Sequence, residues 1–329
     1  MSTGAARSRW RTLTGWVLAG VILAALIWTM RGQDWSEARP MVTSQALPYV
    51  LASCAVNVLA LFFAMLSWRS IMADLGHLLP RRTAAQIYFV GMSAKYVPGA
   101  LWVALTHAKL ARGAGVSGLV TVAVSLLNIP VVLLTGLVVG SLAAPMLLGN
   151  WSWLLLLPAG LLALVLAKPD LTGRAASAAA RLLRRELTST GSGTHTRAAL
   201  GWQLACRLVS GLHLWLLTLA LGAPAGPALL ISVGAFALVT AVSALIVVLP
   251  DGVLVRELFL IGALSQVMPL TAAGAVAVAS RAVCLLTDLS LSGIFAVAMA
   301  RGRLRSAGGP ANRRGQPGLR SVRPAARAD

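Results

Sequence analysis

Residues 86–115 are apolar enough to enter a bilayer, but the backbone of this stretch is interrupted near its middle. Lys95 lies three residues before Pro98, and Gly99 follows directly. Proline removes a backbone donor and blocks a continuing helix, and glycine then permits a turn. Broken backbone at membrane depth is tolerated only where protein or a water-filled cavity covers it. We therefore predict a discontinuous or re-entrant hairpin here.

The charge in this stretch supports two interpretations. An ionisable side chain within a membrane marks a functional site by default, so Lys95 can face a polar cavity. Alternatively, the stretch is a kinked span whose Lys95 snorkels to the surface. Both flanks are basic, with Arg81 and Arg82 before the stretch and Lys109 and Arg112 at its far end. Because basic flanks favour the cytoplasmic side, they favour a hairpin that enters and returns.

The composition indicates a polytopic membrane protein. Of 329 residues, 58% are hydrophobic and 11% are charged, whereas a soluble domain has about 25% charged residues. The net charge of +19 comes from arginines in short loops and tails. That placement is typical of cytoplasmic loops beside an anionic leaflet, so we expect no nucleic-acid partner. Three cysteines in apolar runs, Cys54, Cys206 and Cys284, lack metal-ligand spacing, and we interpret them as buried structural thiols.

The apolar runs predict an all-α transmembrane helical bundle of about eight spans, with one or two broken or re-entrant segments. The expected spans are 14–30, 46–68, 117–143, 152–167, 200–221, 228–249, 253–269 and 270–300.

We expect residues 1–300 to form a single transmembrane domain with a basic cytoplasmic loop at 168–197. Residues 301–329 are predicted to be a disordered basic cytoplasmic tail. Both termini are cytoplasmic if 253–269 crosses the membrane. If that segment also re-enters, this count places the tail outside, and both alternatives stay open.

A second interrupted segment lies in the corresponding position of the other half of the chain. Pro250, Asp251 and Gly252 break an apolar run, and Arg256 and Glu257 follow. Interrupted hydrophobic segments in matching halves are the best sequence indication of a transporter's central site. We therefore predict that the two broken segments face one cavity.

The charged residues of the last span predict ion pairs. Arg281 and Asp288 are seven residues apart, so they share a helix face but are separated by about 10 Å of rise. Each therefore needs another partner, and Glu257 and Lys95 are available. Left unpaired, each charge would cost at least about 2.5–3.5 kcal/mol at mid-bilayer. Such pairs either only hold helices together, or leave Lys95, Arg256 and Arg281 to attract an anionic lipid head group.

Four other polar residues lie within apolar runs. His107 is one or two turns beyond the first break and is a candidate to line the cavity. We expect His213 to form hydrogen bonds within the bundle and Asn128 to bridge helices. Arg207 is expected to snorkel to the cytoplasmic face.

Three motifs resemble a known family. The stretch KYVPGALW, from Lys95 to Trp102, is similar to the "KY-aliphatic-PG-x-x-W" signature of the lysylphosphatidylglycerol synthase transmembrane-region family, also called flippase-like membrane proteins. Residues 250–257 resemble its "GG-x-G-x-R-E" segment, and 280–288 resemble its final "SR…D" helix. The chain departs from the family where Leu254 replaces a usual glycine, and where His107 stands near a frequent arginine.

The resemblance completes the list of candidate residues of a substrate-binding cavity. They are Lys95, Tyr96, Pro98, Gly99, Trp102, His107, Asp251, Gly252, Arg256, Glu257, Arg281 and Asp288.

The resemblance implies transport rather than catalysis. In the synthases this region moves aminoacylated lipid between leaflets, beside a soluble aminoacyl-transfer domain. The chain has no segment for that domain, so we expect no lysyl transfer. No catalytic triad, metal cluster or ATP-binding loop is present in the sequence, so we expect neither an enzyme nor a cofactor.

We therefore expect a translocase of phospholipid or lipid-linked substrate in the bacterial plasma membrane, acting on membrane lipids with anionic head groups. The alternative is a non-transporting membrane partner of a glycosyltransferase or other cell-envelope enzyme. The basic loop and tail would then be its docking surfaces.

Overall fold

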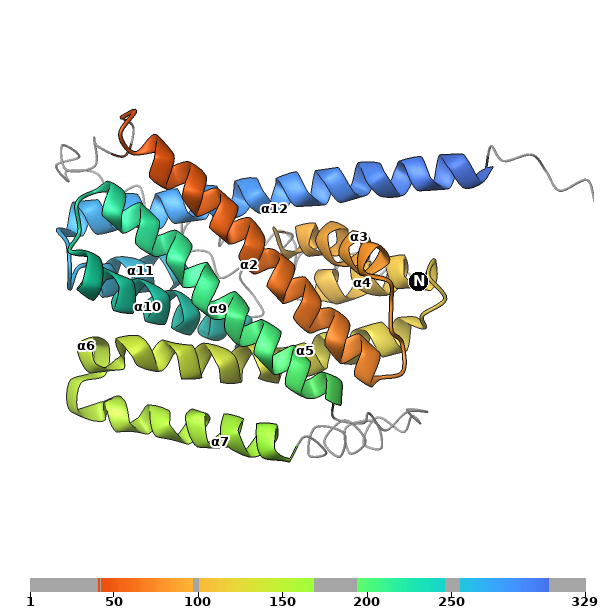
Figure 1. Cartoon of the computed structure of the whole chain (residues 1–329), viewed down its shortest axis with the longest axis horizontal. Helices are drawn as coiled ribbons and strands as arrows, with labels where there is room; N and C mark the ends of the chain where they lie inside the picture. The colour runs from red at the N-terminus through yellow and green to blue at the C-terminus, as the bar shows by residue number, and fades with distance from the viewer. Residues whose placement is uncertain (1–40, 42, 97–100, 169–193, 246–254, 308–329) are drawn as a thin grey trace, which may run out of the picture.

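The computed structural model describes residue 41 and residues 43–96, 101–168, 194–245 and 255–307 (Figure 1). The predicted span 14–30, most of the basic loop and most of the tail lie outside these residues. Every regular element in the described part is a helix, which confirms the predicted all-α class. The elements in chain order are α2 (Leu47–Asp74), α3 (Arg81–Met92), η2 (Ser93–Tyr96), α4 (Leu101–Arg112), α5 (Gly118–Gly140), η3 (Ser141–Ala143), α6 (Ala144–Leu148), η4 (Gly149–Leu155), α7 (Leu156–Ala167), α9 (Thr194–Ala220), α10 (Ala225–Leu245), α11 (Val255–Leu264) and α12 (Leu270–Ala307).

Within the described residues, 6 stretches are long and apolar enough to cross a membrane. They are Leu47–Asp74, Gly118–Leu147, Gly149–Ala167, His195–Ala220, Ala225–Ala244 and Leu270–Arg301. The protein is therefore a multi-pass membrane protein. The expected crossing at 253–269 is absent, because α11 has 10 residues and a helix of that length rises only about 15 Å.

The longest shared contact between two helices joins α2 and α9, which run antiparallel. Ser53 donates a hydrogen bond to the carbonyl oxygen of His213 at 3.0 Å, and Ser67 donates to that of Ala199 at 2.9 Å. Ala60 is buried between these two contacts. Small and hydroxyl-bearing residues allow such close approach, and this is how helices associate where lipid offers no hydrophobic driving force.

Helices α5 and α10 also pack antiparallel, and glycine allows their close contact. A Cβ atom on Gly136 would lie 2.6 Å from the Cβ of Ala241, and one on Gly234 would lie 2.4 Å from that of Ala143. Both contacts are too close for any side chain. This register places the end of α10, at Leu245, beside the middle of α5 rather than beside its end.

The first broken segment forms a hairpin of two short helices. α3 and α4 have 12 residues each, or about 18 Å, so neither can cross a bilayer about 30 Å thick. They pack side by side (Figure 1), with His107 of α4 against Gly91 of α3. The outer ends of both helices share one buried cluster with Leu75 and Val116. This is the geometry of the predicted re-entrant hairpin.

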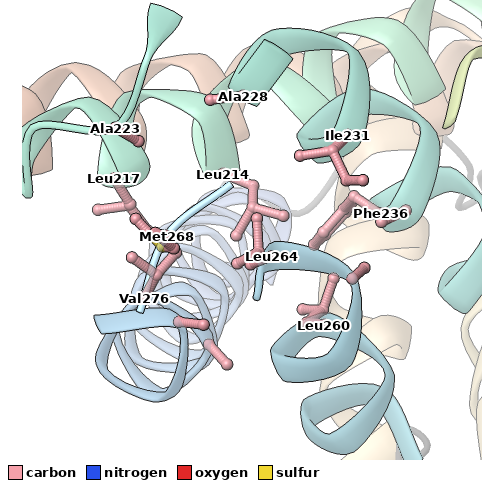
Figure 2. Packing of buried hydrophobic residues seen from close by; sticks show 14 of the residues in the cluster. Leu214, Leu217, Ala223, Ala228, Ile231, Phe236, Leu260, Leu264, Met268 and Val276 are labelled. Atoms are coloured by element: carbon pink, nitrogen blue, oxygen red, sulfur yellow. The ribbon is translucent and has the colours of Figure 1, made fainter. Parts of the chain in front are cut away.

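The second broken segment forms a hairpin that starts from the opposite end of the bundle. Leu260 and Leu264 of α11 pack against Ile231 and Phe236 of α10 (Figure 2). Met268, just beyond α11, reaches the buried cluster at the end of α9. α10 ends near the middle of the bundle, and α11 runs back from there. The chain therefore returns to the end of the bundle at which α10 began.

The second hairpin decides where the C-terminus lies. α12 begins at the end of the bundle where α11 finishes and runs its full length (Figure 1). Near its other end, Phe295 stacks on Phe89 of α3 with ring centroids 5.0 Å apart, and Leu291 joins the cluster of Leu75. The end of α12 and the first hairpin's base therefore lie at the same end of the bundle. The α10–α11 pair returns as a unit, so it does not change the side from which α12 starts.

Candidate functional site

α12 carries a polar stripe that faces both hairpins. Its members share one helix face by their spacing; they are Ser280, Arg281, Cys284, Thr287 and Asp288. The stripe lies in the largely apolar part of α12 that precedes Arg301, and α12 contacts α3, η2, α11, α2 and α9. Both hairpins therefore contact the same helix of the bundle, α12.

The first hairpin delivers an ion pair to this stripe. The Nζ atom of Lys95 lies 2.7 Å from Oδ2 of Asp288. The hydroxyl of Tyr96 donates a hydrogen bond of 2.6 Å to the same oxygen. Both residues belong to the tight helical turn η2, which follows α3 directly. α3 therefore ends just before the two consecutive residues, Lys95 and Tyr96, whose side chains reach the carboxylate of Asp288.

The second hairpin delivers another ion pair about two turns away along α12. Nη1 of Arg281 donates to Oε1 of Glu257, in the first turn of α11, at 3.4 Å. Both ion pairs predicted from the seven-residue spacing are confirmed. In each pair the carboxylate is the more deeply buried partner: the exposed side-chain fractions are 17% and 6% for Lys95 and Asp288, and 22% and 8% for Arg281 and Glu257. The cations are the groups a ligand could reach.

Arg256 is not placed as the cavity prediction expected. Only 5% of it is exposed. Its guanidinium lies over the ring of Phe236 at 4.9 Å, and its Nη2 donates to Ser280 at 3.3 Å and to the sulfur of Cys284 at 3.1 Å. His213 completes this buried network through a 2.9 Å bond between Nε2 and Ser280, as predicted for that histidine. The network fixes α11 to α12 behind the accessible pair of Arg281.

His107 is a packing residue of the first hairpin rather than a cavity residue. It is 2% exposed, its ring stacks on Tyr88, and Trp68 lies against it at 5.3 Å. Its Nε2 lies 3.1 Å from the carbonyl oxygen of Tyr88. Trp102, at the start of α4, is 47% exposed. The remaining candidates lie outside the described residues; they are Pro98, Gly99, Asp251 and Gly252.

The sequence prediction also missed the position of Arg207. It is 6% exposed, so the expected snorkelling is wrong. It stands at the centre of α9, thirteen residues from either end of Thr194–Ala220. From this central position in a membrane-spanning helix the side chain cannot reach either membrane surface, and the sequence position alone could have shown this.

Among the described residues, no three His, Cys, Asp or Glu side chains come together as metal ligands would. What the site does offer is two accessible cations on one helix face, each held by a buried carboxylate. Such an arrangement can bind an anion by partial exchange of the carboxylate.

Comparison with known proteins places this geometry in a family. No curated protein matches the chain. The family model described as "Lysylphosphatidylglycerol synthase TM region" matches residues 16–291. The match covers most of the chain and includes both hairpins and both ion pairs. The chain therefore belongs to the lysylphosphatidylglycerol synthase transmembrane-region family, as its three motifs predicted.

Proposed function

We propose that the protein translocates a phospholipid or lipid-linked substrate with an anionic head group between leaflets, through a central polar cavity. One observation carries the proposal. Two short hairpins from opposite ends of the bundle bring an ion pair each to one face of α12, and in both pairs the cation is the accessible partner. Charges inside a membrane are costly and mark substrate pathways. An anionic head group is the ligand that two such cations favour.

The spacing of the pairs suggests how a head group would advance. Lys95 belongs to the hairpin from one end and Glu257 to the hairpin from the other, and the two ion pairs lie about 10 Å apart along α12. A head group that displaces Asp288 from Lys95 can next displace Glu257 from Arg281. Each transfer replaces one charge-assisted hydrogen bond of the cation by another, and the displaced carboxylate of Asp288 keeps the hydrogen bond from Tyr96. Small movements of one hairpin against α12 would expose the cations to one leaflet at a time.

Sidedness follows from the basic segments. The first turn of α3 with Arg81 and Arg82, the outer end of α4 and the C-terminal end of α12 lie at one end of the bundle. Because all three are rich in arginine or lysine, we place that end in the cytoplasm of a bacterial cell, with the protein in the plasma membrane. We further propose that the chain acts without enzymatic chemistry and without a cofactor.

Leaflet exchange tests the proposal. The purified protein is reconstituted in liposomes containing fluorescent phosphatidylglycerol or phosphatidylcholine, and a membrane-impermeant quencher reports the accessible fraction over time. Lys95→Met and Arg281→Met each remove a charged hydrogen-bond donor worth about 1.5–3 kcal/mol. We expect exchange of phosphatidylglycerol to slow tenfold or more in each variant. Arg301→Met, an exposed change on the same helix, is the matched control and should exchange as the wild type does.

Wild-type protein without exchange of either lipid would refute translocation and favour the non-transporting partner. Equal rates in the wild type and both cation variants would refute the site.

A further inference from the structure

Arg207 is a buried cation whose Nε atom has no hydrogen-bond partner. The side chain is more than nine-tenths buried at the centre of α9. No described residue forms a hydrogen bond or an ion pair with it, in contrast to Arg197 at the start of the same helix, whose Nε donates to the carbonyl oxygen of Leu166 at 2.9 Å. An arginine stays charged in proteins, and a buried charge without a partner is strongly destabilising. A bound anion would supply the partner that the described residues do not.

The register of the bundle places Arg207 at the depth of the first ion pair. The Ser53–His213 and Ser67–Ala199 contacts share one antiparallel register, which sets Arg207 opposite residue 59 of α2. Two residues earlier on α2, Asn57 donates to Thr287 of α12 at 2.7 Å. Thr287 directly precedes Asp288. Arg207 and the carboxylate that holds Lys95 thus lie within about one helical turn of each other in depth.

The Lys95–Asp288 pair is neutral as a unit, because one ammonium faces one carboxylate. Arg207 has no such carboxylate partner among the described residues. The three side chains as a group therefore carry one positive charge in excess, and one anionic charge would neutralise it.

We propose that Arg207 binds the phosphodiester of a lipid head group, at the same depth as Lys95. A guanidinium presents parallel N–H donors that fit two phosphate oxygens, and its unsatisfied Nε is one of them. A phosphodiester carries the single negative charge that the group lacks. The inference rests on the proposed function and names its substrate class: a glycerophospholipid with a phosphodiester, recognised by its phosphate and not by an amino group.

Thermal unfolding of the delipidated protein in detergent tests the assignment. We expect added phosphatidylglycerol to raise the Tm of the wild type, whereas diacylglycerol with the same acyl chains should not. Arg207→Met should abolish that rise. In addition, the lipid-free Arg207→Met protein should unfold at a higher Tm than the lipid-free wild type, because the variant no longer buries a charge without a partner. A purely structural arginine would change the Tm in the opposite direction. Arg197→Met, on the same helix, should keep the full rise.

Retention of the phosphatidylglycerol effect in Arg207→Met would overturn the proposal. A comparable rise with inorganic phosphate alone would overturn the lipid assignment and identify a soluble anion as the ligand.

Leaflet exchange of the same samples separates this proposal from the function it rests on. If the wild type exchanges no lipid but its stabilisation by phosphatidylglycerol depends on Arg207, translocation fails and the phosphate site is supported. If the wild type exchanges lipid and Arg207→Met keeps the Tm rise, the phosphate site fails and translocation is supported.

Discussion

Asp288 accepts two hydrogen bonds on one oxygen, from the ammonium of Lys95 and from the hydroxyl of Tyr96. At the scale of single residues, this carboxylate is the point at which the first hairpin is held to α12. The corresponding carboxylate of the second hairpin, Glu257, has a longer contact to Arg281. The second hairpin is held to α12 by Arg256 as well, through Ser280 and Cys284.

Replacing Asp288 by Asn should destabilise the protein. The change leaves Lys95 beside a neutral group, and we expect a loss of about 1.5–3 kcal/mol in the free energy of unfolding, the range for a hydrogen bond to a charged group. Titration with SDS in mixed micelles measures it. Combined with Lys95→Met, the double variant should lose less than the sum of the single changes, by about 0.5–3 kcal/mol. Strict additivity would show that the pair contributes nothing.

Gly91 should tolerate no side chain, because a Cβ there would lie 2.0 Å from Cδ2 of His107. The imidazole cannot move aside, since Tyr88 and Trp68 pack against it. We expect Gly91→Ala to cost about 1–3 kcal/mol through overpacking of the hairpin. In a His107→Ala background the same change should cost much less, and an equal cost in both backgrounds would contradict this contact. The same titration reports both values.

At the scale of elements, the hairpins depend on short helices held by neighbours that approach unusually closely. α10 is fixed to η3, which directly follows α5, where Gly234 meets the backbone of Ala143. Because α11 folds back on α10, this contact also sets the position of Glu257 relative to α12. A change in the α5–α10 distance should therefore be transmitted to the second ion pair.

Two glycines of α10 provide a matched test of that contact. A Cβ on Gly234 would lie 2.5 Å from the backbone nitrogen of Ala143, whereas nothing lies within 4 Å of one on Gly226. We expect Gly234→Ala to destabilise the protein by about 1–3 kcal/mol. Gly226→Ala should be neutral or gain up to about 1 kcal/mol from helix propensity. Thermal unfolding in detergent distinguishes them, and similar effects of the two changes would be evidence against the close packing.

At the scale of the whole molecule, the ends of the elements fall into two groups. Loop 113–117 and the C-terminal end of α12 lie at one end of the bundle, and the α9–α10 turn lies at the other (Figure 1). This arrangement follows from the second hairpin returning to its starting end. Whether two distant residues lie on the same side of the membrane therefore tests whether the second hairpin returns.

Single cysteines should report this sidedness in a variant whose native cysteines are replaced. Ala114→Cys and Arg301→Cys, both at exposed positions, should react with a membrane-impermeant maleimide from the same side of the membrane. Pro224→Cys, in the α9–α10 turn, should react only from the opposite side. Labelling of intact cells and of inverted vesicles makes the comparison. Reaction of Ala114→Cys and Arg301→Cys from different sides would mean that the α10–α11 pair crosses the membrane instead of returning.

The amino-acid sequence by itself determined the membrane class, the short broken helices and the two ion pairs. Apolar runs and a Pro-Gly break act locally. The seven-residue spacing shows that Arg281 and Asp288 cannot pair with each other, and an apolar bundle offers few other charged partners. The burial of Arg207, Arg256 and His107 was not predicted, because only the tertiary structure decided which way their helices turn. Rotation about a helix axis is set by the close packing of glycine and serine against neighbouring helices. In a uniformly apolar segment, the sequence carries almost no signal for that angle.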